Sequence, residues 1–319
     1  MSDRPLVVQT EELETRAAEW LGQRCDLVRC EPQKLATLNG ELEHAAGLVV
    51  RTYTKVNREV LDHMPGLRVV GRAGVGLENI DVDACLERGV QVVHTPDANS
   101  SAVAELVMAM LLDAIRPRHY LKAAVSPQDW CGLRCGLRGR RQLCEMTVGI
   151  LGMGKVGTMV ARAVAGLGAR VQYHDLIEIP PAQRQGATCV DQHTLLTTSD
   201  VVTVHVDARP SNDGLLGDDL LRKLKPDAIL VNTSRGPVVV AAALARLLHE
   251  RPGMTALLDV HDPEPIGPDY PLLACSNALL TPHIGAATEL ANQKMSWVVE
   301  DVWRVLSGQK PIYSATLRK

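Results

Sequence analysis

The 319-residue sequence contains no phenylalanine, and aromatic residues make up only 3% of the chain. Its hydrophobic cores must therefore be filled by leucine, valine, isoleucine, alanine and methionine. No apolar run approaches the roughly 20 residues that a membrane-spanning helix needs. The first residues, MSDRPLVVQTEELETR, also lack the apolar stretch of a secretory signal peptide. We therefore expect no membrane association and a location in the cytoplasm.

Basic charge is not in excess, because 34 Lys and Arg residues stand against 37 Asp and Glu, for a formal net charge of −3. A nucleic-acid-binding domain usually needs a basic face, so we expect no nucleic-acid partner. A local basic cluster lies in WCGLRCGLRGRRQLC, where it predicts either a solvated loop or an arm that meets another subunit or an anionic substrate. Its arginines are Arg134, Arg138, Arg140 and Arg141.

Cysteine is too sparse for a disulfide scaffold, since eight cysteines are spread over the whole chain. We expect reduced thiols. Cys131, Cys135 and Cys144 form a loose cluster, but no C-x-x-C pair or neighbouring histidine completes a zinc-ligand pattern. The sequence therefore predicts no metal site.

Short β-rich runs alternate with helical stretches along nearly the whole chain, which is typical of parallel βαβ construction. One series of strands precedes a long helix predicted over residues 100–116, and a second series follows it. A helix predicted over residues 288–308 comes after the second series and is expected to pack on the first domain. The predicted strands are PLVVQ, AGLVVRT, LRVVGRA and VQVVHT, then TVGILG, RVQYHD, DVVTVHV, AILVNTS, TALLDV and ALLTPH. This order predicts an α/β fold with doubly wound parallel sheets.

A glycine pattern opens the second series of strands. Gly152, Gly154 and Gly157 have G-x-G-x-x-G spacing directly after a strand and at the start of a helix. This context predicts a tight turn, close approach of a pyrophosphate to the backbone, and a helix N-terminus that binds the phosphates. Asp175 ends the next strand, where a carboxylate can bind the ribose hydroxyls and repel a 2′-phosphate. The pattern therefore predicts a dinucleotide site that favours NAD over NADP.

Three further segments end strands of the second series, at the sheet edge where such folds bind ligands. VNTSRG contains Arg235, LLDVHDPEPI contains Asp259 and Glu264, and LLTPHIG contains His283. A cation for a carboxylate, a base for a hydroxyl and an acid to support that base are the groups needed to oxidise a 2-hydroxy acid. Taken singly, each residue could be a solvated surface side chain, and it is their joint placement that favours a catalytic site.

These segments resemble the D-2-hydroxy-acid dehydrogenase family over nearly the whole chain. The resemblance runs in order through GRAGVGLENID, SSAVAEL, GILGMGKVG, NTSRG, DVHDPEP and TPHIGAAT. It implies two Rossmann-like domains: a flavodoxin-like substrate domain of residues 1–98 and 287–319, and an NAD-binding Rossmann domain of residues 99–286. It also implies a dimer built through the long-helix region.

The resemblance implies that Arg235, Glu264 and His283 are catalytic and that the cofactor is NAD. It also implies that the RAGVG loop binds a substrate carboxylate through backbone N–H groups. For the cofactor we expect contacts from Gly152, Gly154, Lys155, Val156, Gly157, Asp175, His205, Thr233, Asp259 and Gly285. For the substrate we expect contacts from Arg51, Lys55, Gly74, Val75 and Gly76.

The chain departs from the family pattern in three places. Asp207 stands where relatives commonly have proline, and His261 stands where an aromatic residue is usual. The segment VVVAAAL lacks the acidic residues common in VVDEAAL. We interpret His261 as a neighbour of the site and not as a second base.

The substrate is suggested by VVRTYTKVNREVL, which resembles a segment of 3-phosphoglycerate dehydrogenases. Arg51, Lys55 and Arg72 could supply positive charge for a phosphorylated substrate. We therefore expect 3-phosphoglycerate and serine biosynthesis, without the C-terminal regulatory domain of many such enzymes. The alternatives are a glyoxylate or hydroxypyruvate reductase, a D-lactate-type dehydrogenase, and an NAD-sensing binding protein similar to the corepressors of this fold.

Overall fold

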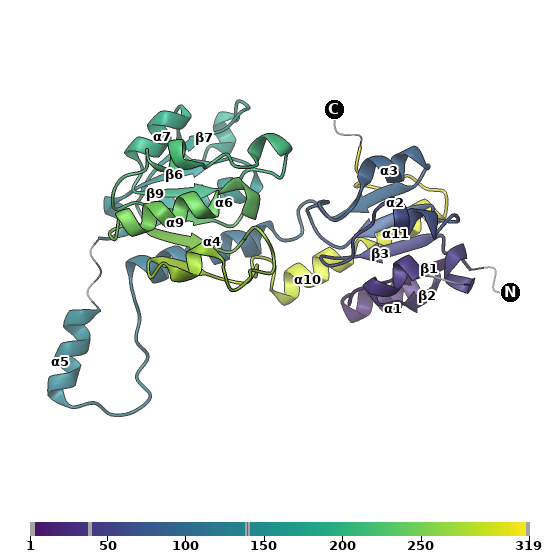
Figure 1. Ribbon diagram of the computed structural model, residues 1–319, viewed down its shortest axis with the longest axis horizontal. Coiled ribbons are helices and arrows are strands. Elements are labelled where there is room, and N and C mark those ends of the chain that lie inside the picture. Colours follow the sequence, from purple (N-terminus) through teal and green to yellow (C-terminus); the bar gives the residue numbers. More distant parts are fainter. Residues whose placement is uncertain (1–3, 38–39, 138, 140, 317–319) are drawn as a thin grey trace. The chain divides into compact units, whose positions relative to one another are not determined.

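The computed structural model describes residues 4–37, 40–137, 139 and 141–316, and the chain forms two compact units (Figure 1). One unit consists of Met1–Asn99 with Ala286–Lys319, and the other of Ser100–Gly285. Arg138 and Arg140 of the basic cluster lie outside the described residues. Within the described ranges, the longest apolar helices are too short or too polar to cross a membrane.

The first unit is built on a five-stranded parallel sheet with the strand order β2-β1-β3-β4-β5. Four strands match the predicted apolar runs, whose valine and leucine side chains are largely buried. The apolar pattern misses the edge strand β2, because its side chains are half-buried or exposed. The strands are β1 (Leu6–Gln9), β2 (Asp26–Arg29), β3 (Gly47–Val50), β4 (Val69–Arg72) and β5 (Gln91–His94).

Short helices with side-chain caps connect these strands. Asn57 accepts a hydrogen bond from the N–H of Val60 at 3.0 Å and so begins α2, and Asp81 begins α3 in the same way. The helices of this unit are α1 (Thr15–Gly22), α2 (Arg58–Asp62), α3 (Val82–Glu87), α10 (Glu289–Ser296) and α11 (Val299–Leu306), with 3-10 turns η1 (Pro32–Thr37) and η2 (Gly40–His44).

The C-terminal helical segment packs on the first unit, as predicted, but it forms two helices and not one. α10 ends at Ser296 and α11 starts at Val299. α11 contacts β3, β4 and β5. A glycine in β4 allows this approach, because a Cβ atom on Gly71 would lie 2.4 Å from a methyl group of Val302. The C-terminal segment thus completes the core of the unit that the N-terminal residues begin.

The second unit contains a seven-stranded parallel sheet with the order β12-β11-β10-β9-β6-β7-β8. This order confirms the predicted doubly wound fold, since the chain starts at β6 and winds outward in both directions. The sequence predicts six of these strands and misses β8, an exposed edge strand of two residues. The strands are β6 (Thr147–Leu151), β7 (Arg170–His174), β8 (Thr188–Cys189), β9 (Val201–Val204), β10 (Ile229–Asn232), β11 (Thr255–Leu258) and β12 (Ala278–Leu280).

Helices cover both faces of this sheet and enclose two hydrophobic clusters. The helices of this unit are α4 (Ser100–Ile115), α5 (Pro127–Gly136), α6 (Lys155–Gly166), α7 (Gln192–Thr198), α8 (Asp218–Leu221) and α9 (Ala241–Glu250), of which α5 does not cover the sheet. The 3-10 turns are η3 (Leu143–Glu145), η4 (Pro181–Gln183), η5 (Pro210–Asn212), η6 (Gly236–Val238) and η7 (Pro271–Ala274).

Part of the arginine-rich stretch forms helix α5 and not only a loop. Ser126 caps α5 by accepting a hydrogen bond from the N–H of Asp129, and no residue of the helix is buried. Figure 1 shows α5 on a long excursion of the chain between α4 and β6. We call residues 116–137 the arm.

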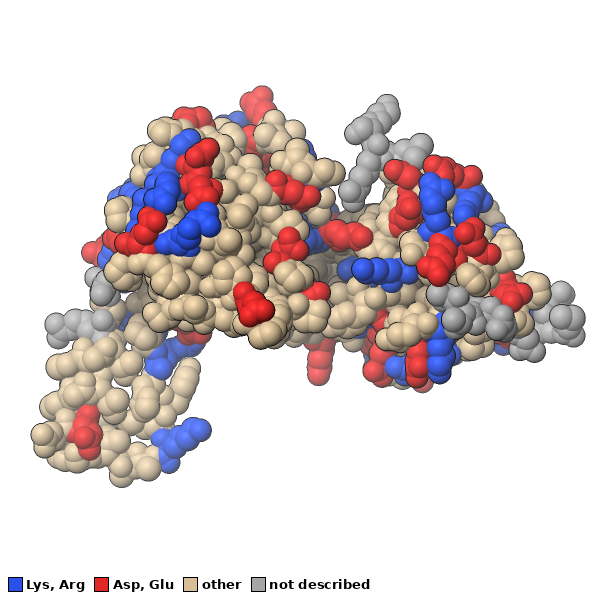
Figure 2. Space-filling view, in the orientation of Figure 1, with Lys and Arg blue, Asp and Glu red and all other residues tan. Residues whose placement is uncertain are grey.

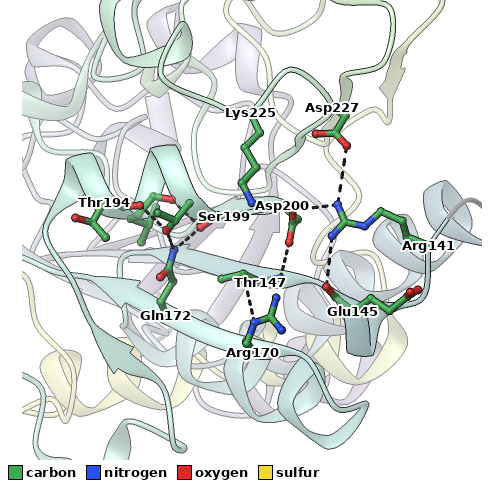
Figure 3. Close-up of polar contacts among 12 residues, drawn as sticks. Arg141, Glu145, Thr147, Arg170, Gln172, Thr194, Ser199, Asp200, Lys225 and Asp227 are labelled. Carbon is green, nitrogen blue, oxygen red and sulfur yellow. Dashed lines mark hydrogen bonds and ion pairs between the residues drawn. The ribbon is translucent and has the colours of Figure 1, made fainter.

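A buried carboxylate ties the arm's return to the sheet (Figure 3). Asp200, just before β9, accepts hydrogen bonds from Arg141 at 3.0 Å, from Lys225 at 2.9 Å and from the N–H of Thr147 at 2.7 Å. Burial alone would raise the pKa of Asp200, but these donors lower it to about 2. The cluster lies at the N-terminal ends of the strands, opposite the edge at which ligands bind.

Candidate active site

The predicted base and its supporting acid meet in the second unit. His283, in the loop after β12, donates a hydrogen bond from Nδ1 to Glu264 Oε2 at 2.7 Å. The other carboxylate oxygen of Glu264 accepts the backbone N–H of His261 at 2.8 Å. With the proton held on Nδ1, the second ring nitrogen of His283, Nε2, is the basic one. The arrangement fixes the tautomer that a general base requires.

The two groups shift each other's titration in opposite directions. The hydrogen bond to Glu264 raises the pKa of His283 above its usual value, against the opposing effects of partial burial and of the Arg235 charge. Partial burial favours the neutral form of Glu264, but the hydrogen bonds from His283 and His261 outweigh it and lower the pKa of Glu264. The acid therefore stays ionised over the pH range in which the histidine exchanges its proton.

The loop that carries His283 is held in an unusual backbone conformation. His283 has φ +52°, in the left-handed region that residues with a side chain rarely adopt. Asp259 secures the loop, because its carboxylate accepts the N–H groups of Ile284 and Gly285, each at 2.8 Å, and the hydroxyl of Thr281 at 2.6 Å. The sequence pattern predicts neither this conformation nor this role of Asp259.

Arg235 lies in the loop after β10, and its charge acts to lower the pKa of His283. Its guanidinium donates to the carbonyl of Ser234 at 2.7 Å. Beside it, the hydroxyl of Thr233 is buried and meets no hydrogen-bond partner among the described residues. A buried hydroxyl in this state can accept or donate a bond to a ligand. The C-terminal edge of the sheet thus brings together a cation, a base with its acid, and a polar group without a protein partner.

The glycine motif has the shape of a dinucleotide site. Gly152 has φ +93°, and a Cβ atom there would lie 2.8 Å from the carbonyl oxygen of His205. A Cβ atom on Gly157 would lie 2.2 Å from the carbonyl oxygen of Gly152, whereas Gly154 faces open space. Gly154 begins α6 without a side-chain cap. The N–H groups of the first turn, which includes Lys155 and Val156, therefore suit a pyrophosphate.

A cavity of about 260 Å³ extends this site along the ends of β6, β7 and β9. Asp175 lies on its wall and accepts the N–H of Met153 at 2.7 Å. His205 also lines the cavity, and burial lowers the pKa of its ring to about 3. Its neutral ring therefore adds no charge to the cavity, whereas Asp175 contributes a carboxylate.

Residues 108–285 match the model of the D-isomer specific 2-hydroxyacid dehydrogenase NAD-binding domain, which is more than half of the chain. The chain belongs to the D-isomer specific 2-hydroxyacid dehydrogenase family. The cofactor of this 2-hydroxyacid dehydrogenase domain is NAD. The site fits it, since the open glycine turn, the uncapped helix and the Thr233 hydroxyl supply the groups that a dinucleotide needs.

Relatives in the 2-hydroxyacid dehydrogenase family differ in the substrates that their names state. The D-3-phosphoglycerate dehydrogenase of Archaeoglobus fulgidus is 36% identical over 275 residues, which cover 84% of this chain and 51% of the relative. The glyoxylate reductase of Aeropyrum pernix is 32% identical, covering 93% of this chain and 91% of the relative. The chain thus spans about half the length of the phosphoglycerate dehydrogenase that it matches.

The fold of this chain is also that of a solved structure. The NADPH-dependent glyoxylate/hydroxypyruvate reductase of Sinorhizobium meliloti, in complex with NADP and malonate, matches with a TM-score of 0.83 and 27% identity. The match covers 98% of this chain and 97% of that chain. A solved structure of this fold is thus described with NADP, whereas the family model that matches this chain is named for NAD binding.

His261, one of the three departures from the family pattern, has a structural place beside the site. Its buried ring makes a hydrogen bond from Nε2 to the carbonyl of Thr281 at 2.9 Å, and Nδ1 lies 3.3 Å from the hydroxyl of Tyr270. Both ring nitrogens are thus engaged, as expected for a neighbour of the site and not for a second base.

The substrate residues predicted from sequence lie in the first unit, in loops after β3 and β4. The carboxylate of Glu11 accepts the N–H groups of residues 51–54 and holds their loop. Arg51 donates from Nη1 to Asn292 at 2.6 Å and to the carbonyl of Glu12 at 2.9 Å, and Lys55 is exposed. Gly74 has φ +155°. Among the described residues, no acceptor meets the N–H groups of Val75 and Gly76, so this loop can offer them to an anion.

Proposed function

We propose that this protein is an NAD-dependent dehydrogenase that interconverts a D-2-hydroxy acid and its 2-oxo acid. The hydrogen bond of 2.7 Å between His283 and Glu264, at the ligand-binding edge of an NAD-binding domain, carries this proposal. A fixed tautomer with a raised pKa suits a group that takes a proton in one direction and returns it in the other.

His283 Nε2 takes the proton of the substrate hydroxyl during oxidation and returns it during reduction. Glu264 holds Nδ1 and stabilises the imidazolium, while Arg235 binds the substrate carboxylate and polarises the oxygen on C2. NAD, which the glycine turn and the start of α6 would hold, would supply the acceptor for the hydride that leaves C2. A positioned base of this kind is typically worth about 10²- to 10⁴-fold in rate.

We propose 3-phosphoglycerate, or 3-phosphohydroxypyruvate in reverse, as the substrate. The loop after β3 supports this, because it presents the exposed Lys55 and keeps Arg51 in a fixed position. The N–H groups of Val75 and Gly76 would receive the substrate carboxylate. Such an enzyme would act in serine biosynthesis and in the cytoplasm.

A panel of 2-hydroxy and 2-oxo acids, assayed with NAD(H) and NADP(H), tests the activity. We expect turnover of 3-phosphoglycerate with NAD at a kcat/KM well above that for glycerate or lactate. Faster turnover of glyoxylate, hydroxypyruvate or lactate would replace the substrate proposal. Tight NADH binding without turnover of any acid would contradict the enzyme and favour an NAD-sensing binding protein.

The phosphate contacts are tested by Lys55→Ala and Arg51→Ala. Each charge-assisted bond is worth about 1.5 to 3 kcal/mol, so each change should lower kcat/KM for 3-phosphoglycerate roughly tenfold to a hundredfold. Arg51 also ties its loop to Asn292, so its effect must be measured as a ratio between phosphorylated and unphosphorylated acids. Equal losses for both kinds of acid would contradict the phosphate role.

We also propose that the protein is a homodimer and that the arm docks on a second copy. No side chain of α5 is buried, and Trp130 is 49% exposed and Tyr120 72% exposed. On the face shown in Figure 2 the arm has uncharged surface between a few charged side chains. A helix that buries nothing against its own chain is stabilised when a partner covers it.

A further inference from the structure

An arginine-carboxylate pair stands on the wall of the cavity that also contains Asp175. Arg209 donates from Nε to Asp207 Oδ1 and from Nη2 to Asp207 Oδ2, both at 2.7 Å. Asn212 steadies the pair, since its amide donates to the carbonyl of Asp207 at 2.9 Å and to its carboxylate at 3.0 Å. All three residues line the cavity. Asp207 is one of the three places at which the sequence departs from the pattern that it resembles.

The pair lies within electrostatic reach of Asp175. The hydrogen bonds with Asp207 are the main reason why the pKa of Arg209 is raised, and the charge of Asp175 adds to the effect. Asp175 itself is held by the N–H groups of Met153 at 2.7 Å and of Ile177 at 3.2 Å. The cavity wall therefore carries two carboxylates and one guanidinium, and both Nε and Nη2 of that guanidinium already bind Asp207.

An arginine at this place that was not paired with a carboxylate would suit a phosphate. A guanidinium fork binds phosphate through two parallel hydrogen bonds, and it does so better than any other side chain. In this chain the same fork faces Asp207, which compensates its charge.

We propose that Asp207 determines cofactor choice by masking Arg209, so that the cavity rejects the 2′-phosphate of NADP and accepts the free ribose hydroxyls of NAD. The inference rests on the proposed function in one respect, because it takes this cavity as the adenosine half of the NAD site. It adds to the role expected of Asp175, because the selectivity for NAD over NADP then comes from two carboxylates and from an arginine that is already bound to one of them.

The test is the ratio of the dissociation constants of NADPH and NADH, measured by the fluorescence change of each nucleotide on binding, without substrate. Asp207→Asn keeps the shape of the side chain but removes the charge, and should lower this ratio at least tenfold. Arg209→Ala leaves Asp207 uncompensated and should raise the ratio. Arg209→Ala combined with Asp207→Asn should abolish the gain in NADPH binding.

Asp213→Asn is the matched control, since Asp213 is an exposed carboxylate of the same loop that does not line this cavity. It removes one negative charge and should leave the ratio within twofold of the wild type. A ratio for Asp207→Asn that equals that of Asp213→Asn would overturn the proposal. So would a gain in NADPH binding that persists without Arg209.

Failure of this inference is separable from failure of the proposed function. If wild-type protein binds neither NADH nor NADPH, the proposed function is wrong. If it binds NADH but Asp207→Asn leaves the ratio unchanged, only the masking of Arg209 is wrong. Because both nucleotides are measured on the same variant, partial unfolding lowers the apparent binding of both and leaves their ratio informative.

Discussion

Glu264 gives His283 two properties that an isolated histidine lacks. The hydrogen bond at 2.7 Å fixes the proton on Nδ1, and the negative charge raises the pKa of the ring. Asp259 adds a third element, since its bonds to the N–H groups of Ile284 and Gly285 keep the loop in its left-handed conformation. The chemistry of one imidazole thus depends on two carboxylates with different tasks.

The pH dependence of 2-oxo acid reduction should reveal the effect of Glu264 on His283. Reduction needs protonated His283, so kcat/KM should fall as the pH rises through its raised pKa. Glu264→Gln removes the charge that raises this pKa, so the alkaline limb should move to lower pH. The profile of kcat/KM with NADH between pH 5 and 10 measures the shift.

Asp269→Asn serves as the control for this profile, because Asp269 is an exposed carboxylate a few residues after Glu264. It should leave the alkaline limb in place. An unchanged limb in Glu264→Gln would mean that Glu264 does not set the titration of His283.

Sequence patterns predict which residues gather at this candidate site but not their conformations. Arg235, Glu264 and His283 come after predicted strands, and the loops at the carboxyl ends of parallel strands lie at one edge of the sheet. The left-handed backbone of His283 depends on contacts with Asp259, which is distant in sequence, and the pairing of Arg209 with Asp207 depends on the irregular conformation of a single loop. No periodicity reports such contacts, so they appear only in the folded chain.

At the scale of the elements, the buried Asp200 connects the start of β6 and the start of β9 with the segment that follows the arm. Its pKa of about 2 lies below the usual value for an aspartate, so its contribution to stability is complete above the unfolded pKa near 4. The contribution is lost as the pH falls through about 2. Removing the charge of Asp200 should therefore lower the free energy of unfolding at neutral pH, and should lower it progressively less in acid.

Asp200→Asn should lower the free energy of unfolding at pH 7 by about 2 kcal/mol. Urea denaturation at several pH values measures this, and the difference from wild type should stay constant down to about pH 4.5 and shrink below it. Asp227→Asn is the control, since its carboxylate is 60% exposed and lies 4.0 Å from Arg141. Equal losses of unfolding free energy for both variants would show that the buried charge of Asp200 stabilises the fold no more than an exposed charge does.

The elements predicted from sequence are those whose side chains are buried. β3, β9 and β10 are buried along their whole length, and their valine and leucine runs are visible in the sequence. β2 and β8 are edge strands with exposed side chains, and so lack an apolar signal. The sequence predicts α5 only as a loop or an arm, because its composition carries no apolar stripe and none of its side chains is buried.

At the scale of the whole molecule, the arm is the feature that a single chain does not explain. Trp130→Glu places a charge on its exposed surface and should convert a dimer into a monomer, as measured by light scattering after size-exclusion chromatography. Leu273→Glu, at a side chain that is 54% exposed outside the arm, should leave the mass unchanged. A monomeric wild type, or a Trp130→Glu variant with the mass of the wild type, would contradict the dimer.

The central claim is that His283 removes the proton while hydride leaves C2 of a D-2-hydroxy acid for NAD. It is tested most directly by mass spectrometry of the NADH formed from D-3-phosphoglycerate, D-glycerate and D-lactate, each labelled with deuterium at C2. Wild-type protein should transfer the label to NADH from at least one of these acids and not from its L enantiomer. His283→Ala should still bind NADH yet transfer almost no label. NADH without deuterium from every acid, or label transfer by His283→Ala at the wild-type rate, would contradict the account.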